Sequence, residues 1–196
     1  MTRIHHPASK HAHPPSPDAG KKPANKSAPV KNQVRQTQDA FVSGPGVAAK
    51  RSAAFENARS VLGRNIQDLK YHGPLAKYLD QWPSDHVCCA NFVSAALEKA
   101  GEIKHHEHND SVRGLAANLR HDPRWGEVSL KQAKPVDVVC FRVPGEGDYA
   151  HVEMFAGWKN GKPTFIGSNN VNRDGSQRIS EGHVGYHVDA VFQFHG

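Results

Sequence analysis

The pattern of apolar and polar residues divides the chain into a helix-forming first part and a strand-forming second part. Between residues 47 and 62 apolar side chains recur at helical spacing, for example at Phe55, Ala58 and Leu62. Gly63 follows directly, and glycine is the residue preferred just after a helix end. We therefore expect a helix over residues 47–62.

The most regular helical pattern covers residues 84–101. Ser84 or Asp85 is suited to cap its first turn, and Gly101 lies just past its end. Six residues at i, i+3, i+4, i+7, i+8 and i+11 form one apolar face, namely Cys89, Phe92, Val93, Ala96, Leu97 and Ala100. A shorter helix is expected over residues 74–81, because a proline stands at its start.

From residue 136 onward the hydrophobic period changes to two, which is typical of strands. Four segments have this pattern: residues 136–143, 149–158, 163–168 and 184–194. The connections between them are short or rich in Gly, Asn, Asp and Pro, so consecutive strands should pair as antiparallel hairpins. Helices followed by such a meander predict an α+β fold, not alternating βαβ units.

Composition separates the first 46 residues from the rest. Residues 1–50 contain eight Lys and Arg against two acids, so the net charge of +6 belongs to this segment and the remainder is neutral. The same segment holds seven of the 13 prolines and one aromatic residue, too little apolar surface for a core. We expect a disordered tail over residues 1–46 and one folded domain over residues 47–196. A neutral domain gives no reason to expect nucleic-acid binding.

The chain has no segment that resembles a membrane span or a classical signal peptide. Its start lacks the uninterrupted apolar stretch of a secretory signal. No run of about 18 apolar residues occurs anywhere in the sequence. We therefore expect neither a cleaved leader nor a transmembrane helix.

The three cysteines are too few for a disulfide framework, and their spacing is not that of a structural zinc site. Cys89 opens the apolar face of the helix over residues 84–101, where unpaired N–H groups favour a thiolate. Cys88 is adjacent but lies about 100° around the helix, off the apolar stripe. Cys140 alternates with Val138 on a predicted strand and is expected in the core.

A histidine and two amides lie where a thiol nucleophile would need them. His151 lies near the start of a predicted strand and should point away from the face of Val152. Glu153 shares the face of His151 and is a second candidate for the cleft. The next strand ends in Asn169 and Asn170, which are suited to orient an imidazole on the adjacent strand. A cysteine at a helix start, a strand histidine and an amide are the arrangement of papain-like thiol hydrolases.

Four short motifs, in this order, resemble those of CHAP and NlpC-type cysteine peptidases. They are CANFV at residues 89–93, VDVVCF at 136–141, HVEMF at 151–155 and FIGSNN at 165–170. The resemblance extends over residues 53–194. Two positions depart from the family pattern. Val136 stands where the family has glycine, and Cys88 stands where relatives often have Trp or Asp.

The resemblance implies a papain-like fold and cleavage of an amide bond in peptidoglycan, by an amidase or a stem-peptide endopeptidase. It implies Cys89 as nucleophile, with its backbone N–H in the oxyanion hole, His151 as base and then acid, and Asn169 as the orienting residue. Asn170 and Glu153 remain alternatives for the third position. No metal or other cofactor is implied.

The expected partner is peptidoglycan. A cell-wall hydrolase without a signal peptide would be made in the bacterial cytoplasm and act in the periplasm or on the wall after specialised export or phage lysis. It would then be an exported antibacterial effector, which uses a secretion machine and is paired with an immunity protein, or a phage lysin.

Two other functions compete with thiol catalysis. A zinc-dependent hydrolase would use the histidine clusters, whose members are His105, His106, Glu107 and His108 in one segment and His183 and His187 in another. A non-catalytic module on the same scaffold would bind the cell wall or a partner protein without cleaving either.

Overall fold

The computed structural model describes residues 45–171 and 177–196, without the side chains of residues 169–171. The described helices are α1 (Pro45–Arg59), α2 (Ile66–Leu69), α3 (Cys89–Ala100), α4 (Val112–His121) and the short 3-10 turns η1 (His105–Glu107) and η2 (Leu130–Gln132). The strands are β1 (Trp125–Glu127), β2 (Val138–Val143), β3 (Gly147–Lys159), β4 (Lys162–Val171), β5 (Gln177–Gly182) and β6 (His187–Phe194). The predicted tail lies outside the described residues, except that Pro45 and Gly46 already belong to α1.

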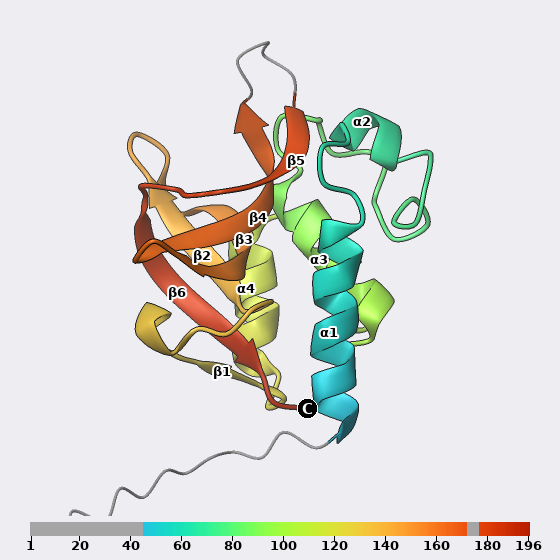
Figure 1. Cartoon of the computed structure of the whole chain (residues 1–196). Helices are drawn as coiled ribbons and strands as arrows, with labels where there is room; N and C mark the ends of the chain where they lie inside the picture. The colour runs from blue at the N-terminus through green and yellow to red at the C-terminus, as the bar shows by residue number, and fades with distance from the viewer. Residues whose placement is uncertain (1–44, 172–176) are drawn as a thin grey trace, which may run out of the picture. The chain divides into compact units, whose positions relative to one another are not determined.

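The strands of the described chain form one antiparallel sheet in the order β1-β6-β2-β3-β4-β5 (Figure 1). Strands β2 to β5 are a meander, and β6 returns to pair with β2 on the side opposite β3. The predicted α+β class with an antiparallel sheet is therefore confirmed. The sequence pattern missed β1 and β5, which are short and contain one large apolar residue each.

The helices form two layers on the sheet. Helix α3 packs against β3 and β4, and α1 packs against α3, so α3 lies between the sheet and α1 (Figure 1). This position explains why the first nine residues of α3 are all buried. Helix α3 ends at Gly101, whose φ of 72° is in the left-handed region that glycine adopts easily. No helix in the described part of the chain is both long enough and apolar enough to cross a bilayer.

The helix predicted over residues 74–81 is not formed, and the helix predicted over residues 84–101 is confirmed from Cys89 onward but begins later than expected. Residues 74–81 form turns, because the buried Asn91 side chain bonds both backbone groups of Asp80: it accepts from the N–H at 3.0 Å and donates to the carbonyl at 2.8 Å. These bonds stabilise a turn at Asp80 and compete with a helical conformation of its backbone. Residues 84–88 also form a turn, so α3 begins at Cys89 and Cys88 is its N-cap, instead of Ser84 or Asp85.

The two faces of the sheet bury different side chains. Val138, Cys140, Val152, Met154 and Ile166 pack in the core that faces the helices. A second cluster on the other face contains Val139, Phe141, Phe155, Phe165 and Val191. Cys140 is thus a core residue as predicted, and burial raises the pKa of its thiol.

Val136 lies just before β2, at the position where the resembled family has glycine. Its φ is 84°, in the left-handed region where a β-branched side chain is strained. Its N–H donates to the Phe155 carbonyl oxygen at 2.8 Å, and its side chain is buried. The backbone conformation at this position is therefore one that glycine adopts more easily.

Candidate active site

Cys89 is the first helical residue of α3, and its thiol lines a cavity of about 580 Å³. The side chain of Cys89 is 5% exposed, so it borders the cavity without protruding from the surface. The first four N–H groups of any α-helix lack an acceptor within the helix, and that of Cys89 is one of them. A thiolate and a developing oxyanion at this end of α3 would both be stabilised by the helix.

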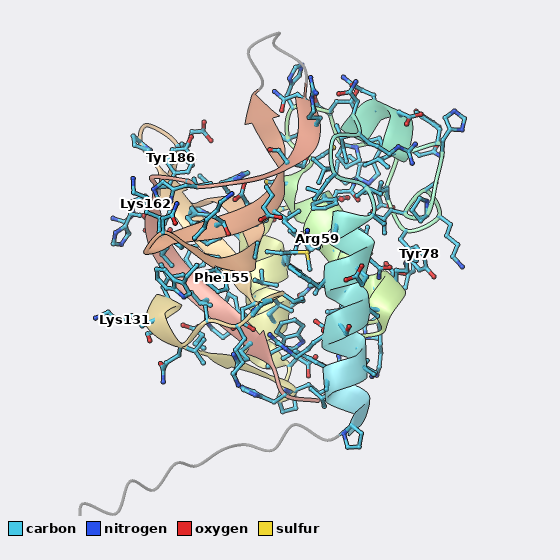
Figure 2. All side chains as sticks on the ribbon, viewed as in Figure 1. Arg59, Tyr78, Lys131, Phe155, Lys162 and Tyr186 are labelled. Atoms are coloured by element: carbon cyan, nitrogen blue, oxygen red, sulfur yellow. The ribbon has the colours of Figure 1, made fainter. Side chains whose placement is uncertain are left out.

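His151 lines the same cavity from β3 and is 8% exposed. Its Nε2 hydrogen-bonds Oε1 of Glu153 at 3.0 Å. The thiol of Cys89 is close enough to the ring to interact with it electrostatically. Because Glu153 takes Nε2, the other ring nitrogen, Nδ1, is left for the thiol. The rings of Phe141 and Tyr186 contact the imidazole at centroid distances of 6.1 and 6.4 Å and limit its rotation. Figure 2 labels Tyr186 and also Phe155, which belongs to the same second cluster as Phe141.

The surroundings of His151 favour its charged form. Burial lowers the pKa of the imidazole, but hydrogen bonds and charge interactions with Cys89 and Glu153 outweigh burial and raise the pKa to about 10. A protonated His151 next to a thiol is the arrangement in which an imidazolium stabilises a thiolate.

Glu153 is fully buried, and its position depends on a glycine in the neighbouring strand. Its Oε1 accepts from His151, while Oε2 has no hydrogen-bond partner among the described atoms. A Cβ at Gly167 would lie 2.5 Å from Cγ of Glu153, so only glycine leaves room for this side chain. Sequence alternation placed Glu153 on the face of His151, and the structure brings the two side chains into contact.

The structure does not place the amides predicted for the third position. The backbones of Asn169 and Asn170 belong to β4, but their side chains lie outside the described residues. Their predicted role therefore stays a prediction. Of the described side chains, the carboxylate that contacts the imidazole is that of Glu153.

Cys88 points away from the cavity. Its thiol is fully buried and donates to the Ser84 carbonyl oxygen at 3.1 Å. Burial raises the pKa of this thiol, and the neighbouring ammonium of Lys70 lowers it by a smaller amount. Lys70 itself is paired with Asp85 at 2.8 Å. The two adjacent cysteines thus differ in surroundings, and the structure brings Cys89, not Cys88, to His151.

The rest of the cavity wall combines apolar side chains with charged groups of both signs. The charged groups include Asp110 from the loop before α4, Arg113 in the first turn of α4, and Glu146 before β3. Arg113 donates to the Asp148 carbonyl oxygen at 3.2 and 3.3 Å, which holds its guanidinium at the rim. A wall of this kind is suited to a substrate that has both carboxylate and amino groups.

Members of the two histidine clusters considered as zinc ligands have separate partners in the structure. His105 is exposed and bonds Glu98, Glu107 pairs with Arg124, and His183 bonds the Pro163 carbonyl oxygen at 3.0 Å. His108 alone joins a potential metal-binding group in the described chain, together with Asp80 and Asp110. Sequence reasoning missed these two aspartates, because nothing in their spacing links Asp80 to a loop beyond α3.

A comparison of the chain with models of known protein families finds no match, and neither does a comparison with curated proteins. The resemblance to CHAP and NlpC-type peptidases therefore remains a prediction from the motifs, and the geometry of the site is the ground for proposing a function.

Proposed function

We propose that this protein is a cysteine-dependent hydrolase that cleaves an amide bond of peptidoglycan. The observation that carries the proposal is the line of contacts from Cys89 through His151 to Glu153 on the wall of one cavity. A thiol, an imidazole and a carboxylate in contact are the groups that nucleophilic acyl transfer requires.

Each group has a role in the proposed reaction. The Cys89 thiolate attacks the amide carbonyl carbon, and the N–H at the start of α3 stabilises the oxyanion that forms. The His151 imidazolium donates its proton to the leaving amine, which departs and leaves an acyl group on the sulfur. Neutral His151 then accepts a proton from water as the water attacks the thioester. Glu153 holds the ring in one orientation and stabilises its positive charge.

The substrate is proposed from the cavity and the motifs together. Peptidoglycan stem peptides carry carboxylates and amino groups, and Arg113 offers a cation while Glu146 offers an anion on the cavity wall. As a cell-wall hydrolase, the protein would be an exported antibacterial effector with an immunity partner, or a phage lysin.

The test is hydrolysis of purified muropeptides and intact peptidoglycan by the full chain, with products separated by chromatography and identified by mass. We expect Cys89→Ala to reduce hydrolysis below detection and Cys88→Ala, the matched control, to retain most of it. The product masses identify the bond, because an amidase frees whole stem peptides from the glycan and an endopeptidase cuts within them. Full activity in Cys89→Ala contradicts the assignment, and wall binding without hydrolysis indicates the non-catalytic module.

The biological role has its own test. We expect the chain to be toxic in a bacterium when an added signal directs it to the periplasm and harmless in the cytosol. Cytosolic toxicity that requires Cys89 would identify a substrate other than the wall.

A further inference from the structure

A second cluster of ionisable groups lies beside the cavity and takes no part in the proposed reaction. Asp80 comes from the turns before α3, and His108 and Asp110 come from the loop after it. One potential ligand atom from each lies within 4.8 Å of the other two. Nε2 of His108 is 3.5 Å from Oδ1 of Asp110 and 3.8 Å from Oδ2 of Asp80.

The orientation of His108 is fixed by a glutamate behind it. Nδ1 of His108 donates to Oε2 of Glu98 at 3.1 Å, so Nε2 faces the two aspartates. The side chains of His108 and Asp110 are only 5% and 10% exposed, yet Nε2 and Asp110 Oδ1 have no hydrogen-bond partner among the described atoms. A buried imidazole nitrogen and a buried carboxylate oxygen that lie 3.5 Å apart without a hydrogen bond call for a partner that both atoms can contact, such as an ion.

The distances fit a cation better than a direct ion pair. A charge-assisted N–H···O bond is about 2.7–2.9 Å long, shorter than both distances from Nε2. Two ligand atoms on a tetrahedral zinc ion, each about 2.0–2.1 Å from the metal, lie roughly 3.3–3.4 Å apart. A carboxylate behind the metal-binding histidine is also the usual support of such a ligand.

We propose that Asp80, His108 and Asp110 bind one Zn²⁺ ion, with Glu98 as the positioning residue for His108. The imidazole nitrogen favours zinc over Mg²⁺ and Ca²⁺, which prefer oxygen ligands. Three protein ligands leave a fourth position for water or a substrate group. Because Asp110 lines the cavity, the ion would lie at its wall and connect the segments on either side of α3.

The site is tested by zinc titration of the full chain, followed by calorimetry. The starting protein carries Cys89→Ala and Gln in place of the four tail histidines, His5, His6, His11 and His13. These changes remove the cavity thiol and a tail segment that could bind zinc by itself. We expect this protein to bind one ion tightly. Since it lacks the nucleophile, the result is independent of whether the proposed hydrolysis occurs.

Variants then identify the ligands. His108→Gln and Asp110→Asn should each abolish tight binding, and Glu98→Gln should weaken it by about 10–100-fold. His105→Gln is the matched control: it contacts the same Glu98 at 3.0 Å but is 87% exposed and lies outside the cluster, so binding should be unchanged. If either buried substitution prevents folding, Asp80→Asn replaces it, because that side chain is 44% exposed.

Cobalt provides the second measurement. Co²⁺ in the proposed site should give weak visible absorption bands without a sulfur charge-transfer band, because its protein ligands are nitrogen and oxygen. A strong sulfur band would place the ion on Cys88 or Cys140 and overturn the proposal. Tight zinc binding that survives His108→Gln, or no tight binding in the starting protein, would overturn it as well.

Discussion

His151 and His108 are each held by a glutamate, and they differ in what the second ring nitrogen faces. Glu153 accepts from Nε2 of His151 at 3.0 Å, and Glu98 accepts from Nδ1 of His108 at 3.1 Å. Beyond the ring, His151 meets the thiol of Cys89, whereas His108 meets two carboxylates.

The difference shows that the glutamate does not decide the chemistry of either site. In both, the carboxylate fixes the orientation of the ring and favours a proton on the nitrogen that it contacts. The group that faces the other ring nitrogen determines which chemistry each site can support. A thiol can exchange a proton with imidazole and attack a carbonyl, while two carboxylates and a neutral imidazole together form a cation site.

Among the substitutions that keep the Cys89 nucleophile, the largest expected effect is that of His151→Gln on hydrolysis. The variant lacks the group that donates and accepts protons, so the rate should fall by about 10²–10⁴-fold. The measurement is the initial rate of muropeptide cleavage. The control is His121→Gln, which alters an exposed histidine in the last turn of α4 that hydrogen-bonds the Ala117 carbonyl oxygen and does not line the cavity. A rate within threefold or so of the natural protein would remove His151 from the proposed mechanism.

Glu153→Gln should reduce the rate of hydrolysis by roughly 10²-fold. The corresponding replacement of the aspartate by asparagine in a serine protease triad reduces the rate by approximately 10⁴-fold. The amide removes the charge that helps to raise the pKa of His151. The alkaline fall of the pH–rate profile should therefore move to lower pH, a shift that mere loss of structure would not cause.

The effect of Glu153→Gln on the rate is to be compared with those of Asn169→Ala and Asn170→Ala, because the sequence motifs predict an amide as the orienting group. We expect each to reduce the rate less than Glu153→Gln does. A larger loss in Asn169→Ala would give the orienting role to the amide.

The pKa of His151 predicts how stability depends on pH. The pKa is raised from 6.5 to about 10 in the folded protein, so folding favours the protonated ring. This stabilisation is complete below about pH 6.5 and is lost as the pH rises to about 10, a change of a few kcal/mol. Urea unfolding of the natural protein and His151→Gln across this range measures it. The stability difference between the two should shrink as pH rises, and a constant difference contradicts the prediction.

The smallest expected effect concerns the glycine beside Glu153. Gly167→Ala places a Cβ 2.5 Å from Cγ of Glu153, so backbone or carboxylate must move, at a cost of about 1–3 kcal/mol. Gly182→Ala, in the adjacent strand β5, is the matched control, because no atom lies within 4 Å of its added Cβ. Its stability should change by less than about 0.5 kcal/mol. Equal free energies of unfolding for the two variants would show that Glu153 has room to move.

The strands and the buried helix could be predicted because local patterns and tertiary packing agree there. Val152 and Met154 alternate along β3 and both pack in the core that faces the helices, as their spacing predicts. The apolar face of α3 is likewise buried as predicted. Strand β5 could not be predicted, because Ile179 is its one fully buried apolar residue and its position depends on pairing with β4.

A residue of the candidate site could be predicted where its position in the helical or strand period is sufficient to show which way it faces. Cys89 and His151 lie at such positions, and the structure brings them together. Glu153 is only one of three candidates that the sequence offers for the third position, because alternation predicts a face shared with His151 but not a contact between the two side chains. The group of Asp80, His108 and Asp110 could not be predicted, because Asp80 is held in place by two hydrogen bonds between its backbone and the Asn91 side chain that only the folded chain shows.

The base and its orienting carboxylate come from a single three-residue stretch of β3. Strand β2 pairs Phe141 with His151 and Val139 with Glu153, so one alignment of the two strands positions both groups. A slip of that alignment by one residue would turn both side chains toward the helices at the same time. A chain with this slip would therefore lose the base and its orienting carboxylate together, and not one of them alone.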